Sequence, residues 1–350
     1  MKKLFMLSGL LVIILAVVFA LTACSVYVFG GGMEVKKTDI TDSFEKINIS
    51  VDTADVNFVL TNDDSCRVEA YDRKKIRYDV SVENCTLNVN TVDERRWFER
   101  IFNPGGAKLT VYLPESEYDS FTIDASTGDI TVPEDFKLGS LDIKLSTGDT
   151  TILASVVESI EIEGNTGDVT IKDITCGSLE VNISTGKTTI SGVTASGEID
   201  IECTTGDVNA NKINASGYLS VETSTGEIVI SDASCTALIT KVSTGKCNLS
   251  DINCESFEST GDTGDVSMAN LIASGKISIE RSTGDVRFDR CDASELDVET
   301  STGSVRGTLL TEKVFVIGTS TGRVDVPETT TGGKCKITTS TGDIKIEIAE

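Results

Sequence analysis

The sequence predicts an all-β protein, a parallel β-solenoid of about twelve coils of 19–20 residues behind an N-terminal β cap and a single N-terminal transmembrane or signal helix. The dipeptide Thr-Gly recurs at a nearly constant spacing from residue 127 onward. Apolar and polar residues alternate on both sides of each Thr-Gly, which is the period of a half-buried strand. Helical periodicity is absent from the same region, so we expect two strands joined at each repeated turn.

The repeat glycines follow one another 19 or 20 residues apart. A unit this short cannot bury its own apolar face, so copies must stack on one another. With parallel strands about 4.8 Å apart, twelve coils make a rod on the order of 55 Å long. We expect a positive φ at each turn glycine. These residues, predicted as the structural positions of the turns, are Gly128, Gly148, Gly167, Gly186, Gly206, Gly226, Gly245, Gly264, Gly284, Gly303, Gly322 and Gly342.

Most of the residues that follow the turn glycines are acidic, and Lys187, Lys246, Ser304 and Arg323 interrupt the row. Stacked carboxylates repel one another at strand spacing, so these interruptions favour electrostatic relief on a solvated edge. A row of weak Ca²⁺ sites is the alternative, since Ca²⁺ takes several oxygen ligands. We expect no metal or cofactor site from the motifs themselves.

The N-terminus reads as a membrane anchor. Two lysines precede an apolar run over residues 4–29, whose 26 residues exceed the roughly 20 that cross a bilayer. The lysines favour a cytoplasmic N-terminus, with an extracytoplasmic chain after Met33. A second interpretation is a lipoprotein signal, because Leu21-Thr-Ala-Cys24 resembles a lipobox with Cys24 as the lipidated residue. Residues 1–32 are therefore predicted as a membrane anchor or lipoprotein signal.

Residues 33–120 are predicted as the N-terminal β cap with the first divergent coils, and residues 121–350 as the repeat solenoid. Apolar positions from Phe44 to Leu60 indicate two strands, and those from Val80 to Val89 indicate a hairpin around Glu83-Asn84. An atypical cap is expected because the end of a solenoid exposes unpaired strand edges.

The segment from Asp93 to Gly106 holds the only tryptophan and a cluster of arginines. Packing of its aromatic residues against the first coils is the simpler interpretation. Contact with lipid headgroups or a partner is the functional one, because aromatic and basic residues suit interfaces. The interaction candidates are Trp97, Phe98, Arg95 and Arg96.

Cysteines fall into the repeat pattern. Cys176, Cys235 and Cys254 lie nine residues after a turn glycine, in a column that also holds Val157 and four alanines. Cysteine in a column of small residues acts as a small apolar side chain, so buried free thiols are expected, with a redox or disulfide role as the alternative. Cys66 and Cys85 are the remaining disulfide candidates.

Composition excludes several function classes. The chain carries 55 acidic and 31 basic residues, a net charge of -24, and no histidine. Without histidine there can be no Ser-His-Asp or Cys-His catalytic system and no histidine-ligated metal. No nucleic-acid partner is expected, because binding phosphates needs a basic surface.

The combination of an N-terminal anchor, the lead-in Phe44-x-x-Ile47-x-Ile49, the strand from Leu109 to Pro114 and serial Ser-Thr-Gly-Asp coils resembles a bacterial "putative adhesin" family, a domain of unknown function. The likeness covers about residues 40–350. It implies surface adhesion and brings no catalytic residues with it.

We therefore expect a non-enzymatic cell-surface protein in the cell membrane, single-pass with an extracytoplasmic C-terminal domain or lipid-anchored at Cys24. Its expected partners are the membrane, through residues 4–29, and a cell-envelope protein or polysaccharide. The alternative is a carbohydrate-active β-helix enzyme acting on an extracellular polysaccharide. The C-terminal segment from Ile344 to Ile348 alternates as a strand, and we expect its exposed edge to allow end-to-end self-association.

Overall fold

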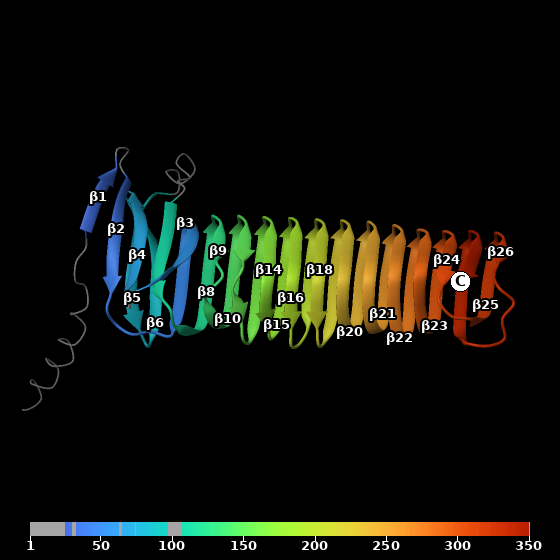
Figure 1. The fold of residues 1–350 in the computed structure, drawn as a ribbon. Helices are drawn as coiled ribbons and strands as arrows, with labels where there is room; N and C mark the ends of the chain where they lie inside the picture. The colour runs from blue at the N-terminus through green and yellow to red at the C-terminus, as the bar shows by residue number, and fades with distance from the viewer. Residues whose placement is uncertain (1–24, 30–32, 63–64, 74, 97–106, 350) are drawn as a thin grey trace, which may run out of the picture.

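The structure, a computed structural model, describes residues 25–29, 33–62, 65–73, 75–96 and 107–349. Across these residues the chain forms β-strands and no helix, and they build one elongated rod with the N-terminal cap at one end (Figure 1). Most neighbouring strands of the rod run parallel, so the predicted all-β parallel solenoid is confirmed.

Strands of the cap and of the rod differ in length and pairing. The cap strands are β1 (Ser25–Phe29), β2 (Met33–Ile40), β3 (Lys46–Thr61), β4 (Cys66–Arg73), β5 (Ile76–Glu83), β6 (Thr86–Asp93) and β7 (Ala107–Pro114). The rod strands are β8 (Glu117–Thr127), β9 (Ile130–Val132), β10 (Lys137–Thr147), β11 (Thr150–Ile152), β12 (Ser155–Val156), β13 (Ser159–Thr166), β14 (Val169–Cys176), β15 (Ser178–Thr185), β16 (Thr188–Ala195), β17 (Ile199–Thr205), β18 (Val208–Ala215), β19 (Tyr218–Thr225), β20 (Ile228–Thr244), β21 (Cys247–Thr263), β22 (Val266–Thr283), β23 (Val286–Thr302), β24 (Val305–Leu309), β25 (Lys313–Thr321), β26 (Val324–Asp325), β27 (Gly333–Thr341) and β28 (Ile344–Ile348).

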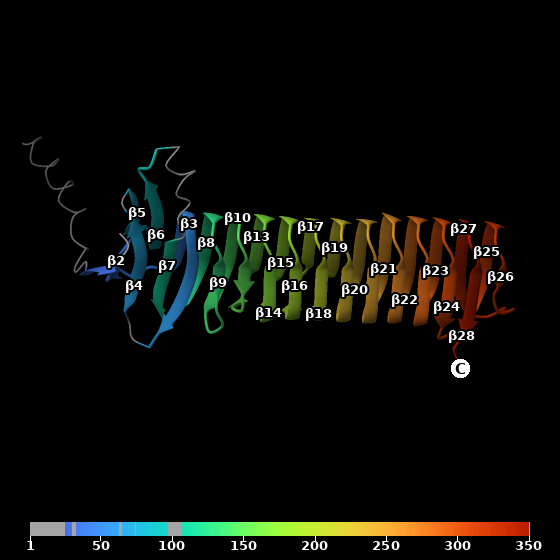
Figure 2. The same ribbon diagram turned by 90° about the horizontal axis from the view of Figure 1, so that it is seen from above.

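Each coil has two strand segments: a first run that ends at the turn Thr-Gly and a second run that begins two residues after the glycine. The two sets of runs form two rows along the rod (Figure 2). Their inward residues meet in one apolar core, in which Ile143, Ile162 and Val181 of successive first runs are fully buried. The long strands β20 to β23 each join the second run of one coil to the first run of the next.

The turn glycines take a positive φ at every predicted position except Gly322. At Gly245, φ is 148°, and a Cβ atom would lie 1.8 Å from the carbonyl oxygen of Gly226 in the coil below. Glycine is therefore required both by the backbone conformation and by the close approach of the neighbouring coil.

The aspartates after the turn glycines form a ladder of hydrogen bonds along the turn edge. Asp149 Oδ1 accepts the backbone N–H of Asp168 (2.8 Å), and Asp168 Oδ1 accepts that of Lys187 (2.8 Å). Glu227, which is one methylene longer, accepts instead from the side-chain amide of Asn248. The preference for aspartate therefore has a geometric reason that electrostatic relief alone does not supply.

Replacing Asp168 by alanine is expected to lower the free energy of unfolding by about 1 kcal/mol, because the N–H of Lys187 loses its acceptor. Asp168→Asn keeps an acceptor oxygen and should retain most of the stability. Urea unfolding followed by circular dichroism measures both. Lys187→Ala is the matched control, and equal losses in the control and in Asp168→Ala would refute the ladder.

A second corner, which the Thr-Gly pattern does not reveal, lies six residues after the turn glycine. Asp173, Gly192, Lys212, Asp232, Asp251, Asn270 and Arg290 all have φ between 52° and 68° at this position. Aspartate, asparagine and glycine tolerate this left-handed conformation best, which is the signal that the sequence carries.

At the C-terminal end the chain order and the spatial order differ. The last coil in sequence, β27–β28, lies between the coil of β23–β24 on one side and β25–β26 on the other. The prediction that the strand from Ile344 to Ile348 is an exposed edge is therefore wrong at Ile344 and Lys345, which pair with β26, whereas among the described residues no strand pairs with that edge from Ile346 to Ile348. The outermost coil is β25–β26. After forming this coil, the chain turns back and forms β27–β28 in the position between β25–β26 and β23–β24.

At the N-terminal end, too, the spatial order of the strands differs from their order in the chain. β3 lies between β8–β9 and the pair β6 and β7, although it precedes both in sequence. Its Thr53 pairs with Thr127, and Asp55 accepts the N–H of Asp129, so Thr53-Ala54-Asp55 is a turn in which alanine replaces glycine. β3 is thus one continuous strand through the corner where two strands were expected. Antiparallel β4, β2 and β1 then close this end.

Several local predictions can be compared with the structure. The hairpin around Glu83-Asn84 is confirmed as β5–β6. The predicted membrane span over 4–29 is wrong for its last five residues, which form β1, while Cys24 and the rest of the span lie outside the described residues. Among the described residues no helix has the length and hydropathy to cross a bilayer.

The cysteine predictions are confirmed in the main. All nine described cysteines are free, so the proposed disulfide of Cys66 with Cys85 is absent. Cys176, Cys235 and Cys254 are buried as predicted, but Val157 of the same column is 78% exposed. The irregular coil around β12 turns Val156 inward in its place.

Candidate functional site

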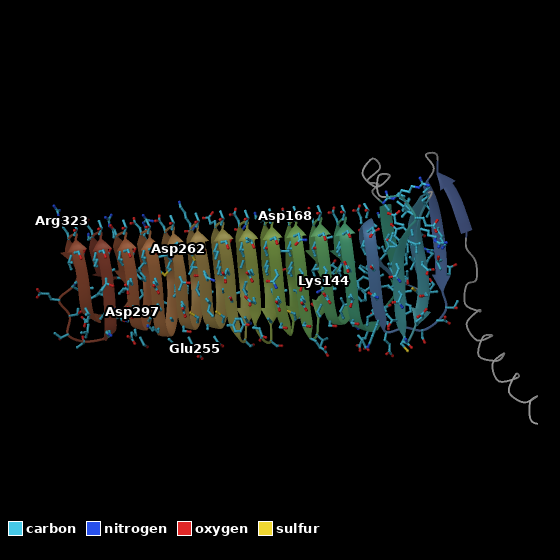
Figure 3. All side chains as sticks on the ribbon, turned by 180° about the vertical axis from the view of Figure 1, so that it is seen from behind. Lys144, Asp168, Glu255, Asp262, Asp297 and Arg323 are labelled. Atoms are coloured by element: carbon cyan, nitrogen blue, oxygen red, sulfur yellow. The ribbon has the colours of Figure 1, made fainter. Side chains whose placement is uncertain are left out.

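The outward residues of the first runs make an acidic face. Asp142, Glu161, Glu180 and Asp200 lie in register on four successive coils. Partial burial, followed by the neighbouring carboxylates, raises the pKa of Glu161. Lys144 and Asp297 belong to this face, whereas Asp168 and Arg323 project from the turn edge (Figure 3).

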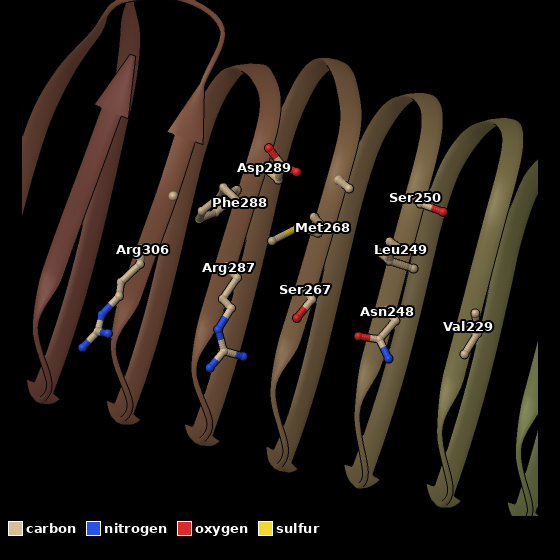
Figure 4. A pocket seen from close by; sticks show the side chains of 12 residues that line it. Val229, Asn248, Leu249, Ser250, Ser267, Met268, Arg287, Phe288, Asp289 and Arg306 are labelled. Atoms are coloured by element: carbon tan, nitrogen blue, oxygen red, sulfur yellow. The ribbon is translucent and has the colours of Figure 1, made fainter. Parts of the chain in front are cut away.

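The second runs carry a different surface. A groove of about 510 Å³ crosses β20 to β24 on this side of the rod. Its outward column runs Val229, Asn248, Ser267, Arg287 and Arg306 on five successive coils. The side chains of Arg287 and Arg306 point in the same direction from neighbouring coils (Figure 4).

Small residues open the groove between these arginines and the rest of the coil. Ser250 and Ala269 follow two residues after the polar column. Gly307 stands next to Phe288 in the column that points inward, where the other coils have larger residues. Its φ is 142°, and a Cβ atom would lie 1.8 Å from the Phe288 carbonyl oxygen, so a side chain there is excluded.

Carboxylates hold the two arginines in place. Arg287 Nη1 lies 3.0 Å from Asp265 Oδ2, and Arg287 Nη2 lies 2.8 Å from Asp285 Oδ2. Arg306 donates to Ser304 Oγ (3.2 Å) and lies 3.6 Å from Asp343 Oδ2. Burial acts to raise the pKa of Asp265, but the N–H of Asp285 and the guanidinium of Arg287 outweigh it and lower that pKa. The groove therefore presents oriented donors and acceptors with a carboxylate held in its charged form.

Sequence comparison identifies the family to which these coils belong. The Toastrack DUF4097 family profile matches residues 44–244 and 230–350, most of the chain. The chain belongs to the Toastrack DUF4097 family. No curated protein sequence matches this Toastrack chain significantly.

Similar solved structures are distant. They include a putative adhesin from Bacteroides fragilis (12% identity, 89% of this chain, 97% of that chain, TM-score 0.27) and one from Parabacteroides merdae (11%, 91%, 97%, 0.32). A third is described as a putative lipid binding protein from Parabacteroides distasonis (14%, 91%, 98%, 0.30). At these TM-scores, the likenesses carry no argument about this chain.

The residues predicted as interaction candidates fall elsewhere. Trp97 and Phe98 lie outside the described residues, as does Cys24, the predicted lipidation site. Arg95 makes an ion pair with Asp93 (2.8 Å), and its side chain is only 10% exposed, while Arg96 is exposed. The groove of this Toastrack chain was missed, although the change from threonine in the early coils to Arg287 and Arg306 in one column is a signal that the sequence contains.

Proposed function

We propose that this Toastrack protein is a non-enzymatic, membrane-anchored extracytoplasmic protein of the adhesin type, which binds an envelope polysaccharide along the groove of β20 to β24. The groove itself carries the proposal, because it combines oriented polar groups with an extended, open shape. The apolar N-terminal run supports the membrane anchor.

The polar groups favour a saccharide. Sugar hydroxyls both donate and accept hydrogen bonds, and the groove offers guanidinium donors, carboxylate acceptors and the Asn248 amide, which does both. The two arginines are surrounded by Asp265, Asp285, Asp289 and Asp343, so the surface is net acidic. Like charges oppose a polyanion, and a neutral polysaccharide is therefore the favoured ligand class.

The lowered pKa of Asp265 argues against this carboxylate as the general acid of a glycosidase. A glycosidase needs a carboxylic acid that stays protonated near neutral pH, which requires a raised pKa. Asp265 is shifted in the opposite direction by Arg287 and the Asp285 N–H.

Calorimetry of the purified full-length protein in detergent with neutral envelope polysaccharides tests the proposal. Arg287→Ala and Arg306→Ala are each expected to weaken binding at least about tenfold, which corresponds to about 1.4 kcal/mol. Lys144→Ala, on the acidic face, is the matched control and should leave the affinity unchanged. Equal affinity of all variants would exclude the groove, and newly formed reducing ends would favour the carbohydrate-active alternative.

A further inference from the structure

The outermost coil at the C-terminal end leaves a strand edge open. β25 pairs in parallel with β27 from Lys313 to Thr321, and among the described residues no strand pairs with its other edge. The opposite end of the rod is closed by antiparallel β4, β2 and β1. The two ends are therefore not equivalent. Among the described residues, β25 leaves the unpaired edge of a nine-residue parallel strand at the C-terminal end. At the N-terminal end the unpaired edges belong to the five-residue β1 and to β5, which carries Arg77 and Asp79.

This edge lacks the charges that normally protect such strands. Eleven of the twelve first runs carry at least one charged residue four, six or eight residues before the turn glycine, whereas β25 has Gly318, Val316 and Val314 there. Val316 takes the column position of Asp297 and Lys336. Natural edge strands are usually blunted by lysine, proline or a bulge, and an uncharged β-branched edge favours pairing with another strand.

Apolar exposure is concentrated on the same coil. Val314, Val316 and Val324 are 39%, 50% and 49% exposed, three of the seven large apolar side chains that are exposed in the described chain. Phe315 and Ile317 are only partly buried because no further coil covers them. Burial of this surface supplies a driving force that the edge hydrogen bonds alone would lack.

We propose that the β25 edge binds the β25 edge of a second copy of this chain, in an antiparallel, two-fold symmetric pair that joins two rods end to end. A two-fold contact uses the same patch on both copies and closes at the dimer. Pairing centred on Ile317 sets Val316 opposite Gly318 of the second copy and Phe315 opposite Thr319 of the second copy.

Electrostatic repulsion between two copies is weakest at the C-terminal end, which favours contact there. Two chains of net charge -24 repel each other, most strongly where the acidic faces meet. Between residues 310 and 332 there are only two basic and three acidic residues, so repulsion is least at this end.

Such a dimer points the two N-terminal caps away from each other. With the N-terminal membrane anchor of the proposed function, on which this step rests, the rods would bridge two facing membranes. The protein would then bind a second copy of itself on the facing membrane, independently of any polysaccharide in the groove.

Analytical ultracentrifugation of the full-length protein in nanodiscs tests the contact, at about 1 to 100 µM, the range of weak reversible association. We expect a dimer that strengthens as salt screens the acidic surfaces. The double variant Val314→Lys, Val316→Lys should raise the dimer dissociation constant at least about tenfold, since it places charges on an edge that the pair would cover and makes the two positions 316 like-charged diagonal neighbours across the pair. Val157→Lys, at the most exposed apolar residue of the described chain, is the control and should leave dimerisation unchanged.

A monomer throughout this range would overturn the proposal, as would a dimer insensitive to the double variant, which would place the contact elsewhere. Circular dichroism and thermal unfolding verify that the variants fold. Aggregation of vesicles carrying the protein, read as turbidity, tests bridging separately, and a dimer that fails to join vesicles would overturn the bridging geometry. Because no polysaccharide is present in these assays, their outcome is independent of the groove proposal.

Discussion

Replacing Gly245 by alanine is expected to lower the free energy of unfolding by at least about 3 kcal/mol. The φ of 148° at Gly245 is nearly inaccessible to residues with a side chain, and the added Cβ would lie 1.8 Å from the Gly226 carbonyl oxygen. Because that oxygen belongs to backbone held by the neighbouring coils, it cannot move away without disturbing the stack. Urea unfolding followed by circular dichroism measures the loss.

Gly318→Ala is the matched control for this prediction. The φ of Gly318 lies outside the left-handed region, and an added Cβ would find its nearest neighbour, Thr338 Cγ2, at 3.6 Å, an ordinary contact. The control should therefore unfold at nearly the urea concentration of the unaltered protein. If Gly245→Ala were as stable as Gly318→Ala, the close approach of successive turns would be wrong.

Raising the pH above about 9 is expected to destabilise the folded protein steeply under reducing conditions. Burial raises the pKa of the Cys247 thiol from 9.0 to about 11, and burial likewise raises those of Cys254 and Cys335 to about 12. Below pH 9 these thiols are protonated in both states, and their contribution to stability is fully present. As the pH rises toward 11 the unfolded chain loses thiol protons that the folded chain keeps, so the unfolded state becomes favoured.

The expected slope is large because many thiols act together. Each thiol that titrates only in the unfolded chain removes about 1.4 kcal/mol of stability per pH unit. Cys66, Cys176 and Cys235 have pKa values of about 11 to 12 for the same reason and add to the effect. With a typical stability of about 5–15 kcal/mol, unfolding is expected roughly between pH 10 and 11.

Urea midpoints from pH 7 to pH 11 measure this dependence. Cys247→Val should reduce the loss of unfolding free energy with pH above pH 9 by the contribution of one thiol, about 1.4 kcal/mol per pH unit. Valine already occupies the same column at Val208 and Val266. Cys85→Ser, at an exposed cysteine, should leave the slope unchanged. Parallel pH profiles for all three proteins would contradict a role for buried thiols.

The positions of corners and strands within each coil could be predicted wherever the same residue type recurs at equivalent positions of successive coils. Thr-Gly gave the first corner because only glycine fits a turn whose neighbour is another backbone. The second corner was missed, since aspartate, asparagine, lysine and arginine share its left-handed conformation and no single residue marks it. The coil at Thr53-Ala54-Asp55 escaped the pattern because alanine replaces glycine there.

Arg281 shows what a column pattern cannot predict. It occupies an inward position and is 2% exposed, with Nη2 donating to Ser259 Oγ (2.7 Å) and Nη1 to the Thr260 carbonyl (2.9 Å). Its guanidinium fits because Gly261 leaves space in the coil below, where a Cβ atom would lie 1.7 Å from Nη1. A charged residue at an inward-facing position contradicts the sequence pattern, and only the space that Gly261 leaves in the neighbouring coil explains it.

The sequence by itself determined the class of fold, the length of the coil and the inward columns, including those that hold cysteine, because each of these follows from a local period repeated along the chain. Only the tertiary structure decided the order of the coils at both ends, the groove beside Arg287 and Arg306, and the open edge of β25. These features depend on which coil lies next to which. When both ends of the chain return inward past a neighbouring coil, sequence spacing no longer gives the neighbour.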